Sequence, residues 1–324
     1  MTTPLRLVAT GAADSRADLA RLSGLSPSTV SQRVEALIAQ DLLREAGAGK
    51  SRGGRRPRQL EVPTDAAIVA ALDLGAHHAR IAAHDLSGQL ITAREVDVEI
   101  GDGPVPGWNG FDVHGFCVAQ AGVPVAVDND ANLMALGEHR WTHPDLEHAI
   151  YVKAGTGIGS GVIAAGRLHR GAQGSAGDIS HCRVTTDPTA QCSCGNTGCL
   201  EAVASGAALV DALRARGLDV SHPRDVTRLA QDGDAAATSI TRAAGRAIGE
   251  ILAVVVNFFN PQAVVIGGVL AECEPLLASM RASLYERSLP FASQALTIER
   301  CATGVDAGVL GAAQLVLDHI LDAV

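Results

Sequence analysis

The sequence lacks any apolar run of the roughly 18–20 residues needed to cross a bilayer, so no membrane-spanning segment is predicted. Its amino terminus, MTTPLRLVATGAADSRADL, has no basic–apolar–small cleavage pattern, and no export signal is expected. Low-complexity tracts and short-period repeats are also missing, which argues against a disordered or solenoid protein. Hydrophobic residues make up 47% of the 324 positions and charged residues 19%. We therefore expect a cytoplasmic protein of two or three domains with sizeable cores.

Charge is unevenly distributed along the chain. Residues 1–62 carry 10 Lys or Arg against 6 Asp or Glu, whereas the remainder carries 16 against 29. A basic block beside an acidic body is typical of a nucleic-acid-binding module, although charge alone fits a solvated basic linker equally well. Six of the ten basic residues fall within residues 44–58: Arg44, Lys50, Arg52, Arg55, Arg56 and Arg58.

The pattern of residues 15–62 predicts a winged helix-turn-helix. Ser15 suits the N-cap of the segment RADLARLSGL, and after a Gly-containing turn Ser26 can cap a second helix that has Pro27 at its first position. The apolar residues of PSTVSQRVEALIAQ share one helical face. The next segment, DLLREAGAGKSRGGRRPRQLEV, fits a strand, a Gly-rich tip and a second strand, which together make a basic wing. The alternative is a helical hairpin inside a larger α-domain.

The second helix of such a module enters the major groove of DNA by its amino end. Hydroxyl, amide and guanidinium groups there, together with the basic wing, suit phosphate and base-edge contacts on double-stranded DNA. The predicted DNA-binding residues are Ser26, Ser28, Thr29, Ser31, Gln32 and Arg33 of the helix, and Lys50, Arg52, Arg55, Arg56 and Arg58 of the wing.

After Pro63, apolar strands alternate with helical segments, which predicts an α/β fold. Two strand–turn units, Asp73-Leu74-Gly75 and Gly155-Thr156-Gly157, hint at a duplicated two-lobe design. The run GTGIGSG could cradle phosphate through its backbone N–H groups, but glycines also serve any tight hairpin. This run matches neither the dinucleotide-binding fingerprint nor the P-loop.

Three of the seven cysteines, Cys192, Cys194 and Cys199, lie close together, and His181 precedes Cys192 by eleven positions. Three thiolates and one imidazole complete a closed tetrahedral zinc set, and in the cytosol this clustering favours a metal over a disulfide. With no position left for water, a structural ion is expected. A set of scattered buried cysteines is the alternative, and Cys182 could substitute as a ligand.

Polar residues also gather in Asp128-Asn129-Asp130-Ala131-Asn132, which follows an apolar strand and precedes a helix. Carboxylates and amides at the carboxyl end of a strand fit a site where hydroxyl groups bind and are deprotonated. A helix cap would explain Asp130 or Asn129 alone, but not four polar groups in five positions.

Together these motifs resemble the ROK family, which groups sugar-responsive repressors and sugar kinases. The resemblance spans nearly the whole chain and is most specific in GSAGDISHCRV and CSCGNTGCLEA. It implies an actin-like fold of two ribonuclease-H-like lobes with a sugar between them, and it gives His181 a role in both zinc and sugar binding. If the protein is a kinase, the resemblance implies Asp130 as the catalytic base. The implied sugar ligands are Asn129, Asp130, Asp178, His181 and Glu201. The implied remnants of the phosphate loops are Asp73, Gly75, Gly155, Thr156 and Gly157.

The sequence departs from the kinase pattern of this family at three places. The first phosphate loop of the kinases reads Asp-x-Gly-Gly-Thr, whereas Ala76 and His77 follow Gly75 here, which gives ATP and Mg²⁺ little support as cofactors. The Glu-x-Gly-His motif becomes Asp178-Ile179-Ser180-His181. Relative to the family pattern, some tens of residues are missing near 104–106, either by natural deletion or because a segment is omitted from this sequence, and the first lobe is expected to lack part of its sheet.

We therefore expect a DNA-binding domain in residues 1–64, a truncated first lobe in 65–135, and a second lobe with the zinc loop in 136–324, whose C-terminal helix returns to the first lobe. The predicted function is a transcriptional regulator of carbohydrate metabolism, a repressor controlled by a sugar or sugar phosphate in the cleft between the lobes. It would bind operator DNA as a homodimer or homotetramer. The alternatives are an ATP-dependent sugar kinase that keeps a DNA-binding module, and a DNA binder that has lost its ligand.

Overall fold

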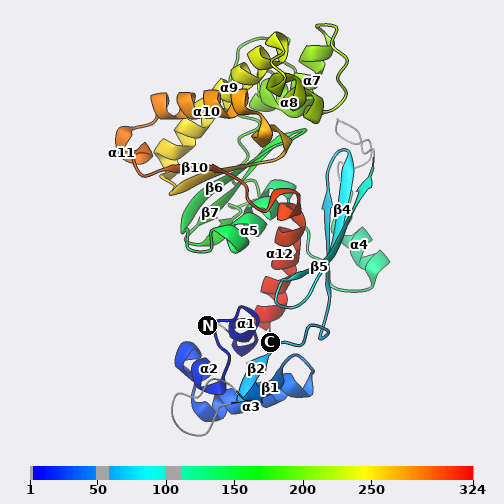
Figure 1. The fold of residues 1–324 in the computed structure, drawn as a ribbon, viewed down its shortest axis with the longest axis vertical. Helices are drawn as coiled ribbons and strands as arrows, with labels where there is room; N and C mark the ends of the chain where they lie inside the picture. The colour runs from blue at the N-terminus through cyan, green and yellow to red at the C-terminus, as the bar shows by residue number, and fades with distance from the viewer. Residues whose placement is uncertain (1–2, 49–57, 99–110, 324) are drawn as a thin grey trace. The chain divides into compact units, whose positions relative to one another are not determined.

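Figure 1 shows the computed structural model of the chain, which describes residues 3–48, 58–98 and 111–323. The chain divides into two compact units. Unit 1 comprises Met1–Leu72, Arg80–Glu95 and Ala312–Val324, and unit 2 comprises Asp73–Ala79 and Val96–Gly311. Several positions singled out in the sequence lie outside the described residues: Lys50, Arg52, Arg55, Arg56 and the junction at 104–106.

Unit 1 begins with a small helical module followed by a pair of antiparallel strands. The Ser15 hydroxyl accepts a hydrogen bond from the backbone N–H of Asp18. The Ser26 hydroxyl accepts one from the backbone N–H of Thr29, so both predicted N-caps are present. Helix-turn-helix followed by paired strands is the winged helix that the sequence predicts. Its elements are α1 (Pro4–Ala9), α2 (Arg16–Ser23), α3 (Pro27–Ala39), β1 (Arg44–Ala48) and β2 (Arg58–Glu61).

A three-stranded sheet in the order β3-β4-β5 follows this module in the chain. Its strands are β3 (Val69–Leu74), β4 (His78–His84) and β5 (Leu90–Asp97). In β3 the exposed fraction alternates along the strand, with Val69 and Ala71 buried and Leu72 exposed. Alternation of this kind is expected for a strand with one face on the core and one face open.

The centre of unit 2 is a mixed five-stranded sheet in the order β10-β9-β6-β7-β8. β6 runs antiparallel to β7 and parallel to β9, and β10 runs parallel to β9. Helices cover both faces, as the α/β pattern of the sequence predicts. The strands are β6 (His148–Ala154), β7 (Ile158–Ala164), β8 (Arg167–His169), β9 (Ala263–Gly267) and β10 (Thr297–Arg300).

Alternate residues of β6 enter two different apolar cores. Ile150 and Val152 pack among the helices that follow β8 in the chain, whereas Ala149 and Tyr151 pack with residues of α5 (Asp130–Thr142) on the opposite face. The remaining helices of unit 2 are α4 (Val113–Ala121), α6 (Leu200–Ala204), α7 (Gly206–Arg214), α8 (Pro223–Gln231), α9 (Ala235–Phe259), α10 (Glu274–Arg287) and α11 (Pro290–Ser293).

The last helix, α12 (Ala307–Ala323), belongs to both units, since the division falls between Gly311 and Ala312. In unit 1 the Arg6 guanidinium pairs with the Asp318 carboxylate at 2.8 Å, and the Thr3 hydroxyl donates to the Leu321 carbonyl. One segment, Gly304–Leu321, has the length and hydropathy of a membrane span. Six of its side chains are buried within the protein, as in a core helix: Ala307, Val309, Ala313, Gln314, Leu317 and Leu321.

Candidate functional site

The amino end of α3 presents the polar groups predicted to read DNA. The Ser26 hydroxyl lies 2.9 Å from that of Ser28 and 2.8 Å from that of Thr29, so the three form a connected polar surface. Gln32 and Arg33 follow on the same helix with exposed side chains. Small hydroxyls, an amide and a guanidinium at a helix amino end suit contacts with phosphates and base edges.

Ion pairs stabilise the described part of the wing and connect it to α2. Arg58 pairs with Glu45 across the two strands, and Arg16 of α2 bonds to the same carboxylate at 2.9 Å and to Glu35 at 2.7 Å. The hydrogen bond from Arg58 lowers the pKa of Glu45, which keeps this carboxylate ionised. Arg58 is 74% exposed and its guanidinium has five N–H donors, so it could contact a DNA phosphate while its pair with Glu45 stays in place.

A group of six polar residues surrounds the first turn of α5, and we call it the α5 cluster: Asp128, Asn129, Asp130, Asn132, Lys153 and Arg170. The Asn129 side chain caps the helix, because its Oδ1 accepts from the backbone N–H groups of Ala131 and Asn132. Asp130 Oδ1 also accepts from the Ala131 N–H, and its other oxygen pairs with the Lys153 ammonium. A cap thus explains only part of this polar sequence.

Asp128 is held more tightly than any carboxylate of a simple cap would be. Its Oδ2 accepts from Nε and Nη2 of Arg170 at 2.7 and 2.6 Å. Its Oδ1 accepts from the Asn132 amide at 2.9 Å and from the Asn129 N–H at 2.8 Å. Sequence reasoning missed both cations of the α5 cluster, Lys153 and Arg170. One signal was available, since Lys153 is one of only two lysines in the chain and stands two positions before Gly155.

Glu201 links the glycine loop to the predicted sugar ligands. Its Oε2 accepts from the Ile158 N–H at 2.8 Å, and a Cβ on Gly157 would lie 2.9 Å from Oε1. Burial raises the pKa of Glu201, and the charges of His181, Asp178 and Asp130 also act on that pKa. These acidic and imidazole groups are therefore within electrostatic reach of one carboxyl.

The glycines of GTGIGSG meet packing needs of the protein itself. A Cβ on Gly161 would lie 2.4 Å from the Ala135 Cβ, so α5 lies directly on β7 only because glycine is there. The carbonyls of Gly155 and Thr156 accept from the N–H groups of Gly206 and Ala207 at 2.9 and 3.0 Å. Close packing thus accounts for Gly161 and for Gly159, where a Cβ would lie 2.9 Å from the Ala131 Cβ, but not for Gly155, where a Cβ would meet only the Gly157 carbonyl oxygen at 3.8 Å.

The other phosphate-loop remnant, Asp73–Gly75, lies beside imidazoles. A Cβ on Gly75 would lie 2.5 Å from the His78 ring, and a Cβ on Gly308 would lie 2.1 Å from the Asp73 carboxylate. The His77 ring stands 5.3 Å from that of His222, centroid to centroid. The His78 ring and the Gly308 backbone thus lie close to the remnant.

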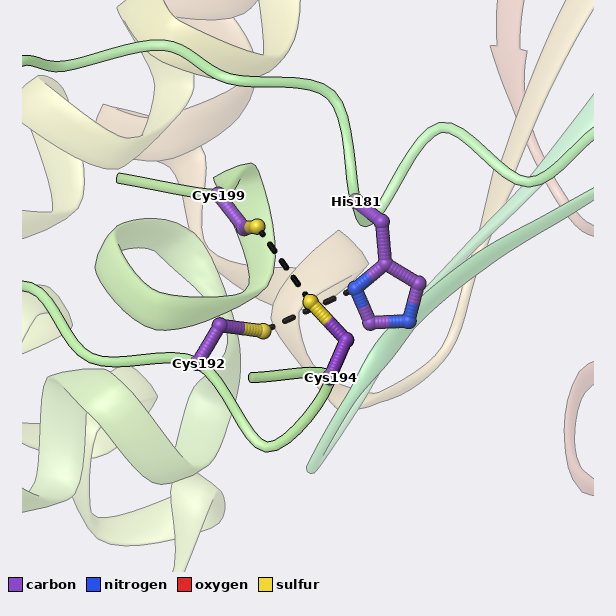
Figure 2. Close-up of side chains that lie close together, drawn as sticks. All are labelled: His181, Cys192, Cys194 and Cys199. Carbon is purple, nitrogen blue, oxygen red and sulfur yellow. Dashed lines mark hydrogen bonds between the residues drawn. The ribbon is translucent and has the colours of Figure 1, made fainter. Parts of the chain in front are cut away.

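The four predicted zinc ligands converge, as Figure 2 shows. We call this set the metal cluster: His181, Cys192, Cys194 and Cys199. Their ligand atoms all lie within 4.8 Å of one another, and the Cys194 and Cys199 sulfurs are 3.7 Å apart. A tetrahedral ion with metal–sulfur bonds of about 2.3 Å needs sulfurs about 3.8 Å apart, so the set fits zinc. Cys182, the substitute considered from sequence, is outside the set.

The pKa values of two thiols in the metal cluster are shifted in opposite directions. The backbone N–H of Asn196 lowers the pKa of the Cys194 thiol to about 7, whereas burial raises that of Cys199 to about 12. The His181 ring turns Nδ1 toward the Cys192 sulfur at 3.6 Å, and Nε2 lies 3.9 Å from the Asp178 carboxylate. Asp178 in turn accepts from the Ser180 hydroxyl at 2.7 Å. The metal cluster and the predicted sugar ligand Asp178 thus share one loop.

Comparisons with known proteins cover both parts of the chain. Residues 96–319 match the family described as ROK family, and residues 15–44 match that described as winged helix-turn-helix DNA-binding. The xylose repressor of Bacillus spizizenii is 30% identical, over 96% of this chain and 92% of its own length. A crystal structure of a ROK family transcriptional regulator, a homolog of the E. coli MLC protein, superposes with a TM-score of 0.77 at 25% identity, covering 98% of this chain and 96% of that chain.

Kinases are also similar, but over less of the chain. A ROK family glucokinase from Streptomyces griseus, solved with glucose and AMPPNP, superposes with a TM-score of 0.66 at 25% identity, over 77% of this chain and 99% of its own. A regulator is therefore favoured over a kinase, because the repressor alignment spans almost the whole chain. That alignment runs over 357 positions, more than the 324 residues here, so the repressor carries residues that this chain lacks.

Proposed function

Because the chain belongs to the ROK family, we propose that it is a DNA-binding transcriptional repressor of carbohydrate genes, controlled by a sugar or sugar phosphate. One observation carries the proposal: the similarity to a xylose repressor extends over 96% of this chain, which includes the winged helix. The ligand would bind at Asn129, Asp130, Asp178, His181 and Glu201. In support, the charges of His181, Asp178 and Asp130 act on the pKa of Glu201.

We assign residues 1–64 to the DNA-binding domain, 65–135 to a short first lobe and 136–324 to the second lobe. Two copies of α3, one from each protomer of a homodimer or a homotetramer, would read half-sites about one helical turn apart. Such a regulator acts in the cytoplasm, where the operator is. A coupling of about 1–3 kcal/mol between sugar and DNA binding is enough to change operator occupancy several-fold or more.

The metal cluster would hold Zn²⁺ as a structural ion. Its three thiolates and one imidazole leave no position open for water, so the ion would hold the loop in place rather than activate a nucleophile. That loop carries both Asp178 and His181, and metal binding would therefore set the position of the sugar ligands.

An ATP-dependent sugar kinase is the second candidate, favoured by Asp130 and by the similarity to the Streptomyces glucokinase. Two observations weigh against it. The Asp130 carboxylate is already paired with the Lys153 ammonium, whereas a general base must be free to accept a proton. Ala76 and His77 stand in the first phosphate loop. ATP and Mg²⁺ remain weakly supported as cofactors.

The test selects operator DNA from a random-sequence pool with the purified chain and then measures affinity by fluorescence anisotropy. We expect sequence-specific binding that weakens when the correct sugar is added. Arg33→Ala should weaken operator binding by about 1–3 kcal/mol if Arg33 reads a base, whereas the exposed Arg216→Ala of unit 2 should bind like wild type. Equal affinity for operator and random DNA would contradict the proposal, and sugar phosphorylation lost in Asp130→Asn would favour the kinase.

A further inference from the structure

The charges of the α5 cluster cancel within the cluster. Each of its two carboxylates is bound by its own cation: Asp128 by Arg170 and Asp130 by Lys153. Asp128 is 10% exposed and uses both oxygens, so it cannot release Arg170 without leaving a nearly buried charge unpaired. Asp130 is 43% exposed, and a ligand can therefore reach it while its ion pair stays intact.

Lys153 sits between two glycine positions of the sheet. In the register of β6 its neighbours are Gly159 on β7 and Gly267 on β9, so no side chain stands directly beside it on either strand. The ammonium is 24% exposed and is directed to Asp130. We conclude that the position of Lys153 favours its ion pair with Asp130. The surface that this pair presents is polar but carries no net charge.

We propose that this site takes an uncharged sugar rather than a sugar phosphate, because Asp130 occupies the Lys153 ammonium and leaves that cation unavailable to a phosphate group. The inference rests on the proposed function and narrows its ligand to one chemical class. A phosphate group brings a charge of about −1.5 to −2 at neutral pH and needs cations that are not already paired. Sugar hydroxyls need only acceptor lone pairs, which a carboxylate bound to one cation still offers.

Two other groups could be considered as phosphate ligands. Burial lowers the pKa of the His222 imidazole, and the charge of His77 lowers it further, so His222 supplies no lasting positive charge at neutral pH. The Arg183 guanidinium, which lines a small cavity with His181, donates to the Thr185 carbonyl at 3.3 Å and to the Thr197 hydroxyl at 3.2 Å. These hydrogen-bond partners of Arg183 are uncharged, so its role as a phosphate ligand can be tested directly by substitution.

The test is titration calorimetry of the full chain with matched pairs: glucose and glucose 6-phosphate, N-acetylglucosamine and its 6-phosphate, xylose and xylose 5-phosphate. We expect at least one neutral sugar to bind at least about tenfold more tightly than its phosphate, which is 1.4 kcal/mol. Asp130→Asn frees the Lys153 ammonium, so it should weaken the neutral sugar and strengthen its phosphate. Mere structural damage would weaken both ligands. The matched control is Asp219→Asn, an exposed carboxyl of unit 2 that should leave both affinities unchanged.

The remaining outcomes overturn the inference in distinguishable ways. If the wild-type chain prefers a phosphorylated sugar, the inference is wrong while the proposed function stands, and loss of that binding in Arg183→Met would identify the cation responsible. If Asp130→Asn weakens the binding of neutral and phosphorylated sugar equally, the Asp130–Lys153 pair does not determine the preference. If no sugar of either class binds, sugar control itself fails, and the inference fails with it.

Discussion

The metal cluster and the α5 cluster lie in the same unit but are held by different means. The α5 cluster is fixed by regular structure, since a capped helix and a central strand position its side chains before any ligand binds. The metal cluster lies in a segment whose pairing is limited to isolated bridges, such as Arg183 with Cys199 and Gln191 with Thr197. A site built on helix and strand keeps its geometry without help, whereas a site built on turns needs an ion to hold it.

Removal of the metal should give the largest loss of stability among the changes that we predict. Cys194→Ser breaks the tetrahedral set, and structural zinc contributes on the order of 10 kcal/mol to the folding of the segment it holds. We expect loss of bound zinc by elemental analysis and a melting temperature lower by several degrees or more. Cys117→Ser, at a free thiol outside the metal cluster, is the control. A Cys194→Ser chain with full zinc content and unchanged melting would show that the ligand set is wrong.

Loss of one ion pair in the α5 cluster should have an intermediate effect. Arg170→Met leaves the nearly buried Asp128 carboxylate without its cation, and we expect a loss of about 2 kcal/mol, reduced because Arg170 itself is 41% exposed. Urea denaturation measures this loss. Asp211→Asn removes an exposed pair with Arg214 at 3.7 Å and should cost less than about 0.5 kcal/mol. Equal losses in the two variants would mean that Asp128 is not held as described.

The smallest effect on stability is expected from His139, which lies near the carboxyl end of α5. Burial lowers the pKa of the His139 imidazole below its ordinary 6.5, so the unfolded chain binds this proton more readily than the folded one. Stability from this group is therefore present above pH 6.5 and is lost as the pH falls toward the lowered pKa. Melting temperatures of wild type and His139→Gln from pH 8 to 6 should diverge, with the variant depending less on pH. Parallel curves of melting temperature against pH would show that His139 does not cause the pH dependence.

The sequence could predict what is local. Ser15 and Ser26 cap their helices through a neighbour three residues away, and the metal cluster draws its ligands from one short stretch of chain. Such features depend on spacing alone, and spacing can be read from a sequence. The winged helix and the α/β pattern were predictable for the same reason.

What could not be predicted depends on distant partners. Lys153 and Arg170 reach the α5 cluster from positions 23 and 42 residues away from their carboxylates, and no periodicity marks them. The role of Gly161 follows from the Ala135 side chain that α5 brings against it. α1 was missed as an element because six residues are too few to show an apolar period.

The contacts between α1 and the last turns of α12 have a consequence for synthesis of the protein. Thr3 and Arg6 find their partners 318 and 312 positions later in the chain. While the ribosome is still translating the α/β region, the first helix of the DNA-binding module therefore has no completed surface to rest on. Tight operator binding should arise only after the final helix emerges, so a nascent or prematurely terminated chain would bind DNA poorly.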